Sequence, residues 1–169
     1  CSKINQLIAN LKKSESRRMY NDYYYKTNAI KTCAEYISSI IDQNSKIVII
    51  PIPPSKSKDD VLYDNRIMQI AEQVGHKRSN VNVLEFVEQV ASTEAVHLSD
   101  AKRPTPEQLQ KNYRILSDFS LPPTIDAVII LDDVLTTGSH FKAIKNMLLE
   151  KYPNLSDVIY GLFIAKVIR

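Results

Sequence analysis

The chain has 169 residues, of which 44% are hydrophobic, 24% charged and 8% aromatic, which is typical of one globular domain. Its net charge of +3 is too small to indicate a nucleic-acid-binding protein by itself. The two cysteines, Cys1 and Cys33, exclude a disulfide framework and a CxxC metal site. The three glycines are spaced so that neither GxGxxG nor GxxxxGK[ST] occurs, which excludes a standard dinucleotide-binding loop and a P-loop.

The sequence contains no stretch near the roughly 18 consecutive apolar residues that a membrane span requires. We therefore expect a soluble, cytoplasmic protein with no membrane partner. The first residue is Cys and not Met, so a targeting segment ahead of it stays open.

Residues 1–44 predict two amphipathic helices, which we expect to form a hood over a site or a homodimer surface. Apolar residues recur at helical spacing twice, as Ile4, Leu7, Ile8 and Leu11 and again as Ile30, Ala34, Ile37 and Ile41. Basic and aromatic residues lie between the helices: Lys12, Lys13, Arg17, Arg18, Tyr20, Tyr23, Tyr24 and Tyr25. Two interpretations stay open here, a surface that contacts nucleic acid and a solvated helix end beside a tyrosine cluster.

A strand buried on both faces is predicted at Ile47–Ile50, a continuous β-branched run that prolines end. A polar loop at residues 55–60 precedes a helix with Leu62, Ile67, Ile70, Ala71 and Val74 on its apolar side. Gly75 is predicted to cap the C-terminus of this helix. Cys33, on the apolar face of the second N-terminal helix, is predicted to be a core residue.

The next segment predicts a strand at Val81–Val87 and then a long exposed loop from Glu88 to Arg103. Loops of this length in compact domains usually have a function. A further helix is predicted to start at Thr105, because a hydroxyl at the cap, Pro106 at the first helical position and Gln108 three residues past the cap form a start signal.

The last third of the chain predicts a βαβ unit. An apolar strand at Ala127–Leu131 is followed by a polar turn at Asp132–Gly138, an amphipathic helix at Ser139–Tyr152 and a strand at Val158–Ala165. Such units pair their strands in parallel and bind ligands at the carboxyl ends of the strands. We therefore predict an α/β fold with a mainly parallel sheet flanked by helices, and a site at the turn.

The residues of this turn are suited to a phosphate and a sugar. The backbone amides of Thr136–Ser139 would lie at a helix N-terminus, where unpaired N–H groups and the helix dipole favour an anion. Three hydroxyls add donors, and Gly138 permits close approach and a positive φ. Asp132 and Asp133 would repel the same phosphate, so we expect them to face neutral hydroxyls of the ligand or its magnesium ion.

The segment resembles the ribose-phosphate loop of type I phosphoribosyltransferases: an apolar strand, two acidic residues, two variable residues, Thr-Thr-Gly and a small hydroxyl residue. The resemblance implies a type I phosphoribosyltransferase-like core at residues 45–169, an N-terminal helical extension and Mg²⁺ as cofactor. It also implies that Asp132 and Asp133 bind the ribose hydroxyls of phosphoribosyl pyrophosphate (PRPP), while the 5-phosphate is bound by Thr136, Thr137, Gly138 and Ser139. The alternative is an ordinary strand-to-helix turn with acidic and capping residues.

The loop after the first strand occupies the place of the family's pyrophosphate loop. Ser55, Lys56 and Lys58 are therefore predicted to bind pyrophosphate. Nearby acidic residues would weaken such a site unless they point away or hold magnesium, and these are Asp59, Asp60 and Asp64. A solvated loop that caps the next helix is the alternative.

The Glu88–Arg103 loop lies where the family has its catalytic flap, and the resemblance implies that Lys102 or Arg103 is a basic catalytic residue on the leaving pyrophosphate. A stretch with Arg103, Pro104, Gln108 and Asn112 is similar to ComF-type proteins, a competence-associated branch of the family. His97 is expected to belong to the flap or to lie exposed. His140 is expected to line the phosphate pocket or to cap the helix.

Two functions follow from the resemblance. The first is an enzyme that transfers the phosphoribosyl group of PRPP to a nitrogenous base and releases pyrophosphate, with Asp132, Asp133, Lys102 and Arg103 as catalytic residues. The second is a catalytically inactive PRPP or nucleotide sensor, or a partner subunit in a nucleic-acid-related or defence pathway. The acidic residues after Lys58 and the lack of a recognisable base-binding segment favour the second function.

Overall fold

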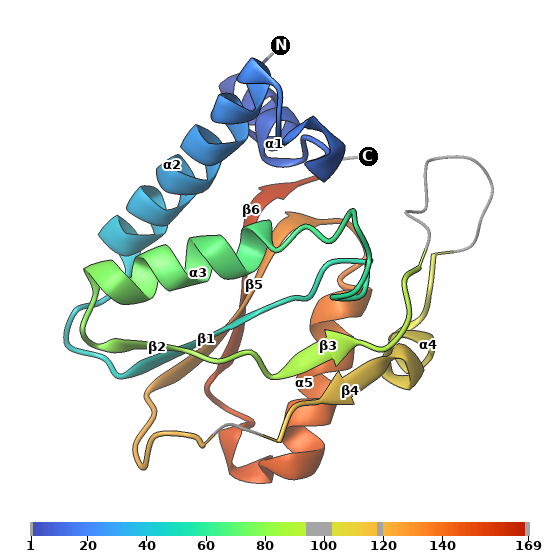
Figure 1. Ribbon diagram of the computed structural model, residues 1–169. Coiled ribbons are helices and arrows are strands. Elements are labelled where there is room, and N and C mark those ends of the chain that lie inside the picture. The colour runs from blue at the N-terminus through green and yellow to red at the C-terminus, as the bar shows by residue number, and fades with distance from the viewer. Residues whose placement is uncertain (1, 94–102, 118–119, 168–169) are drawn as a thin grey trace.

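The fold is built on a sheet of four parallel strands in the order β2-β1-β5-β6 (Figure 1). We describe it from a computed structural model that covers residues 2–93, 103–117 and 120–167. The strands are β1 (Ile47–Pro51), β2 (Val81–Val83), β5 (Ala127–Leu135) and β6 (Ile159–Lys166). The predicted α/β architecture with a mainly parallel sheet is thus confirmed.

The pairing of the two central strands, β1 and β5, indicates where a ligand is expected to bind. β1 pairs with β5 along its whole length, from Ile47 opposite Ala127 to Pro51 opposite Leu131, and all five residues of β1 are buried. The chain leaves β1 toward β2 on one side and leaves β5 toward β6 on the other. This is the topological switch point at which open parallel sheets form a crevice at the carboxyl ends of their strands.

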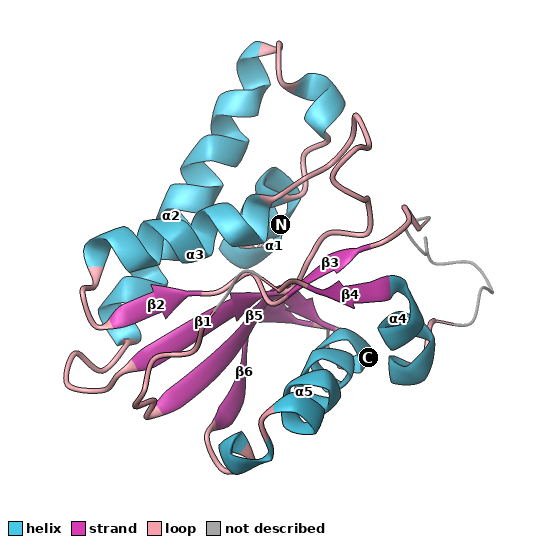
Figure 2. Ribbon diagram, turned by 60° about the horizontal axis from the view of Figure 1, so that its bottom comes forward, coloured by secondary structure: helices cyan, strands magenta, loops and turns pink. Residues whose placement is uncertain are grey.

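Helices cover both faces of the sheet (Figure 2). One face is covered by α1 (Lys3–Leu11), α2 (Tyr24–Ile40) and α3 (Arg66–Lys77), and the other by α5 (Ser139–Lys151) with α4 (Pro106–Asn112) beside it. Short 3₁₀ turns lie at Glu15–Arg17, Asn21–Tyr23 and Pro153–Leu155.

Burial and capping confirm the predicted patterns of α2 and α4, whereas Leu62, predicted on the apolar side of α3, is exposed and precedes that helix. In α2 the residues Ile30, Ala34 and Ile37 are buried in the core cluster that this helix shares with α1, α3 and the sheet, and Cys33 is buried among them. Before α4, the Thr105 hydroxyl accepts from the Gln108 amide, and the Gln108 side chain accepts from the Thr105 amide. These reciprocal bonds satisfy two backbone donors that a helix start would leave unpaired.

The predicted strand at Val81–Val87 is confirmed only at its two ends, because the chain changes sheets within it. β2 ends at Val83, and the next strand, β3 (Val87–Gln89), pairs antiparallel with β4 (Tyr113–Ile115) in a separate two-stranded sheet. Phe86, between them, is fully buried in the core on the α5 side. Apolar residues therefore occur on both sides of the break and within it, and periodicity does not mark where β2 ends. Glu88 and Gln89, predicted to start a loop, are strand residues.

Two predicted boundaries are also wrong. Gly75 does not cap α3 but lies inside it, where an added Cβ would come within 3.0 Å of Val83 Cγ2. Close packing of α3 on β2 therefore accounts for this glycine. β5 does not end at Leu131 but continues to Leu135, because β6 pairs beside it as far as Lys166. Asp132 and Asp133 are consequently strand residues and not turn residues.

Across the part of the chain that the structure describes, no helix is both long enough and apolar enough to cross a lipid bilayer.

Candidate functional site

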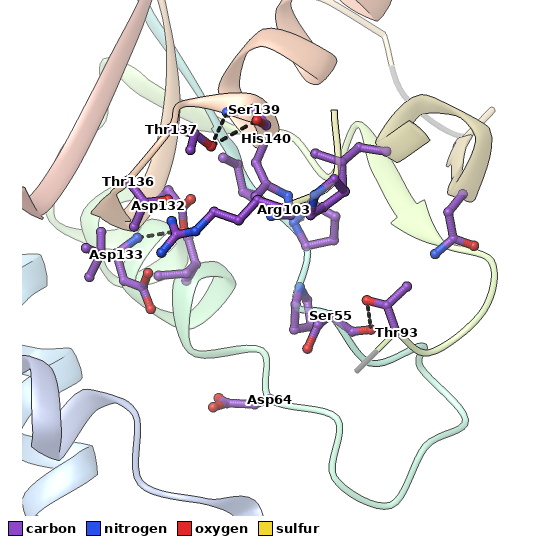
Figure 3. Close-up of a pocket in the computed structure, with 18 of the residues that line it drawn as sticks. Ser55, Asp64, Thr93, Arg103, Asp132, Asp133, Thr136, Thr137, Ser139 and His140 are labelled. Carbon is purple, nitrogen blue, oxygen red and sulfur yellow. Dashed lines mark hydrogen bonds between the residues drawn. The ribbon is translucent and has the colours of Figure 1, made fainter. Parts of the chain in front are cut away.

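A cavity of about 690 Å³ lies at the carboxyl ends of β1 and β5 (Figure 3). The segment after β1 contributes Ile52 to Ser55, and β5 with the start of α5 contributes both aspartates, Val134, Thr136, Thr137, Ser139 and His140. Further walls come from Lys12 after α1, Arg66 at the start of α3, Thr93, and residues around α4. The cavity thus occupies the crevice that the strand order predicts.

The segment between β5 and α5 forms a donor-rich turn on the cavity wall. Gly138 has φ 73° and caps α5, a helix of 13 residues. The hydroxyls of Thr137 and Ser139 lie 2.9 Å apart, and the Ser139 amide donates to Thr137 Oγ1. Hydroxyls and the positive end of the helix dipole therefore meet at one place, which suits an anionic group.

Replacement of Gly138 by alanine tests the backbone of this turn. An L-residue at φ 73° is strained, so we expect Gly138→Ala to lower the free energy of unfolding by about 1–2 kcal/mol. The measurement is urea denaturation, with Ser139→Ala as the control that keeps the backbone unstrained. A Gly138→Ala protein as stable as the wild type would contradict this assignment of strain.

Asp132 and Asp133 have different environments because successive residues of a strand point to opposite sides. Asp133 is buried, and its Oδ2 accepts from Arg66 Nη2 at 2.6 Å and lies 3.5 Å from Lys12 Nζ. Asp132 forms no ion pair with a described residue; its Oδ1 accepts from the Asp133 amide at 2.8 Å. One carboxylate is therefore held by cations of the protein, and the other is left for a ligand.

These environments separate the two pKa values. Burial, with the nearby charge of Asp133, raises the pKa of Asp132 to about 7. Burial also disfavours the charged form of Asp133, but the charges of Arg66 and Lys12 outweigh it and lower its pKa. Near neutral pH, Asp133 is ionised, whereas Asp132 is protonated in part of the molecules. Asp132 can therefore accept hydrogen bonds from hydroxyl groups as a carboxylate, or transfer a proton.

The structure places the predicted pyrophosphate-loop residues apart. Ser55 lines the cavity, whereas Lys56 and Lys58 do not. Lys58 Nζ lies 2.8 Å from Glu85 and 3.4 Å from Glu88, so its charge is directed toward the β3 side.

The acidic residues of this loop have partners of their own. Ser57 Oγ donates to Asp59, Ser92 Oγ donates to Asp60, and Asp64 accepts from Lys26 and Arg66. Their charges are therefore directed at these partners, although Asp64 itself lies on the cavity wall.

The structure does bring Arg103 to the cavity, where its side chain points inward in Figure 3. Pro104, Gln108 and Asn112, which the sequence grouped with Arg103, line the same wall. Lys102 and His97, the other flap residues considered, lie outside the described residues.

Lys12 and Arg66 are cavity cations that sequence reasoning missed. Lys12 comes from the N-terminal helical segment, 121 positions before Asp133, and nothing local marks its role. Arg66 is the first residue of α3, where a cation opposes the helix dipole. This unfavourable local placement is the one signal that could have indicated a carboxylate partner elsewhere.

A buried lysine attaches the N-terminal segment to the site. Lys26 is fully buried, and its Nζ donates to the Lys13 carbonyl at 2.7 Å and to Asp64 Oδ2 at 2.7 Å, and lies 2.8 Å from Glu15 Oε1. Asp64 also accepts from Arg66, which holds Asp133. Burial disfavours ionisation of Glu15, but hydrogen bonds from Lys26 and Tyr23 outweigh it and lower the pKa of Glu15. A continuous series of ion pairs therefore connects the N-terminal helical segment to the cavity.

Two further observations concern clusters of metal-ligating residues and the buried cysteine. The described residues contain no group of three or more His, Cys, Asp or Glu side chains that could hold a metal ion. Burial raises the pKa of Cys33 to about 11, so this core thiol stays protonated.

No protein-family model matches this sequence, and no curated protein matches it.

Proposed function

We propose that this cavity binds a phosphoribosyl ligand, PRPP or a nucleotide containing ribose 5-phosphate, and that the protein transfers the phosphoribosyl group to a nitrogenous base. The observation that carries the proposal is that Asp132 and the donor-rich turn Thr136–Ser139 border one cavity. A carboxylate suits sugar hydroxyls, and the turn suits a phosphate. A sugar phosphate uses both at once. A type I phosphoribosyltransferase-like fold agrees with the parallel sheet and with the site at its switch point.

In this proposal each part of the ligand has its own wall. The 5-phosphate lies on Thr136–Ser139, and the ribose hydroxyls donate to Asp132. The diphosphate faces the cationic wall of Lys12, Arg66 and Arg103. Arg66 is already bound by Asp64 and Asp133, so Arg103 and Lys12 are the cations with more freedom to contact the ligand.

The transfer needs no covalent bond to the protein. Departure of pyrophosphate from the ribose leaves positive charge on the sugar, and a nitrogen of the acceptor base then bonds to the same carbon. The protein positions the two reactants and stabilises the charge that develops on pyrophosphate, for which Arg103 is the candidate. Asp132, with a pKa of about 7, is suited to accept hydrogen bonds from the ribose or a proton from the acceptor.

The site fits a magnesium ion that enters with the ligand. Mg²⁺ prefers oxygen ligands and is commonly held by one or two carboxylates together with substrate phosphates. Asp132 has no ion-pair partner among the described residues and offers such an oxygen at the cavity, next to the proposed diphosphate position. When bound, the ion would neutralise part of the diphosphate charge.

A second candidate function is a PRPP or nucleotide sensor without catalysis. The ion pairs of Lys58 with Glu85 and Glu88 favour it, because they turn a predicted pyrophosphate-binding cation away from the cavity. A sensor needs the ribose-phosphate half of the site but not groups that stabilise a leaving pyrophosphate.

The experiment is calorimetric titration of PRPP with magnesium into the wild-type protein, followed by a pyrophosphate-release assay with a panel of purine and pyrimidine bases. Binding with release establishes the transferase. Binding of PRPP with no release from any base supports the sensor. A folded protein that binds neither PRPP nor ribose 5-phosphate refutes both.

The pH dependence of binding gives a further expected result. Because Asp132 has a pKa of about 7 and accepts from ribose hydroxyls as a carboxylate, PRPP affinity should rise as the pH increases from 6 to 8. Ionisation of the ligand phosphate acts in the same direction over part of this range. The Asp132→Asn protein is the control, since it retains only the phosphate contribution. An identical pH profile in both proteins would contradict the role of Asp132.

A further inference from the structure

His140, in the wall of the cavity, forms a hydrogen-bonded pair with Tyr113 behind it. Tyr113, on β4, is only 6% exposed, and its hydroxyl oxygen lies 2.7 Å from Nδ1 of His140, the second residue of α5. His140 also lines the cavity beside Thr137 and Ser139 (Figure 3). The imidazole is thus held by the core on one side and faces the cavity on the other.

The surroundings select one tautomer of His140. Burial raises the pKa of Tyr113, with a contribution from Asp132, so the phenol keeps its proton. Burial lowers the pKa of His140 despite the charge of Asp133, so the imidazole is neutral near pH 7. The Tyr113 hydroxyl has no second partner among the described residues, and a buried hydroxyl proton without an acceptor is costly. Tyr113 therefore donates to Nδ1, and the proton of His140 is on Nε2.

The Nε2–H group is open to the cavity. Nε2 makes no hydrogen bond to a described residue. Among the described residues, no side-chain polar atom is both fully buried and unpartnered. Nε2 is therefore accessible, and His140 lines the cavity. The ring cannot turn without breaking its hydrogen bond to Tyr113. Its Nε2–H group is therefore a fixed, unpaired donor that a ligand in the cavity can use. Its neighbours in the chain are the hydroxyl and amide donors of the β5–α5 turn.

We propose that His140 is a ligand-binding residue whose Nε2–H donates a hydrogen bond to a phosphate oxygen of the bound sugar phosphate, and that Tyr113 is the positioning residue that orients it. The inference rests on the proposed function and adds a neutral side-chain donor to the phosphate site. Because the donor is neutral, it contributes to binding without proton uptake. It also favours a phosphate ester over the corresponding sugar without phosphate.

The first test is titration of ribose 5-phosphate and PRPP into the wild type, His140→Leu and His140→Gln. Loss of a hydrogen bond to a charged acceptor should weaken binding about 10-fold or more in His140→Leu. His140→Gln should keep most of the affinity, because the glutamine amide places an N–H near the position of Nε2. Urea denaturation checks that all three proteins are folded.

The outcomes separate this inference from the proposed function. A wild type that binds either sugar phosphate, with a His140→Leu protein of equal affinity, overturns the role of His140 alone. A folded wild type that binds neither ligand overturns both. Equal losses in His140→Leu and His140→Gln also overturn the inference, since a donor at the Nε2 position would then not matter.

The second test reads the tautomer directly. The chain has three histidines, so the ¹⁵N imidazole signals of His140 are assigned by their absence in His140→Leu. We expect protonated Nε2 and unprotonated Nδ1 in the free protein, and a shift of the Nε2 signal when ribose 5-phosphate binds. Tyr113→Phe should mix the two tautomers and weaken binding less than His140→Leu does. Protonated Nδ1 in the wild type would overturn the orientation.

Discussion

Asp132→Asn is expected to weaken PRPP binding roughly 10- to 100-fold, because it removes the charge of the carboxylate that accepts hydrogen bonds from the ribose; each hydrogen bond to a charged group contributes about 1.5–3 kcal/mol. The fold should stay intact. Asp132 has no ion pair with a described residue, and asparagine keeps an oxygen that accepts from the Asp133 amide. Calorimetric titration with PRPP and magnesium measures the change.

The stability of this variant supplies an independent check. The folded-state pKa of Asp132, about 7, lies above its value in an unfolded chain, so the contribution of this group to stability is lost as the pH rises through 7. Asp132→Asn should therefore be at least as stable as the wild type at pH 8. Reduced binding in an equally stable protein assigns the loss to the site, whereas unchanged binding would remove Asp132 from it.

Two further aspartate variants are compared with Asp132→Asn. Asp157→Asn changes an exposed aspartate outside the cavity and should leave binding unchanged. Asp133→Asn removes one of the two carboxylate partners of Arg66 and should lower the free energy of unfolding by about 3 kcal/mol. A loss of binding in Asp133→Asn would therefore mix a structural and a functional effect, which makes Asp132→Asn the cleaner test.

Lys26→Met is expected to lower the free energy of unfolding by about 3–5 kcal/mol, the usual cost of removing one partner of a buried ion pair. Lys26 is fully buried, and methionine is apolar and unbranched, so the main loss is the charge and not the packing. Glu15 keeps Arg18 and Tyr23 as partners, and Asp64 keeps Arg66. Neither keeps the shared cation that joins the N-terminal segment to the cavity wall. Urea denaturation, compared at equal m-value, measures the effect.

Lys31→Met is the matched control for this prediction. Lys31 lies on the same helix and its Nζ is 3.9 Å from Glu35, but both side chains are more than half exposed. Exposed pairs contribute little, so the control should stay within about 1 kcal/mol of the wild type. The double variant Lys26→Met/Glu15→Gln should recover part of the lost stability, because a buried carboxylate that has lost its buried cation is neutralised as well. A Lys26→Met protein as stable as Lys31→Met would refute the role given to this lysine.

Local sequence signals were enough to predict β1, the start of α4 and the donor-rich start of α5. Local rules suffice there. A β-branched run ended by prolines can only be buried strand in this context, and the Thr105 and Gln108 signal needs no distant partner. Gly138 followed by hydroxyl residues and an amphipathic run likewise predicts a helix start with donors.

Strand lengths and the partners of charged groups could not be predicted in the same way, because both depend on residues far apart in the chain. β5 extends to Leu135 because β6 pairs with it up to that residue, and the sequence of β5 alone does not indicate this pairing. Lys58 is turned to Glu85 and Glu88, whereas Arg66 and Lys12 reach Asp133, although nothing local in the sequence distinguishes these three cations. Tyr113 orients His140 from a strand that begins 27 residues earlier. Charge and hydrogen-bond pairing act through space, so residue types and local spacing do not specify them.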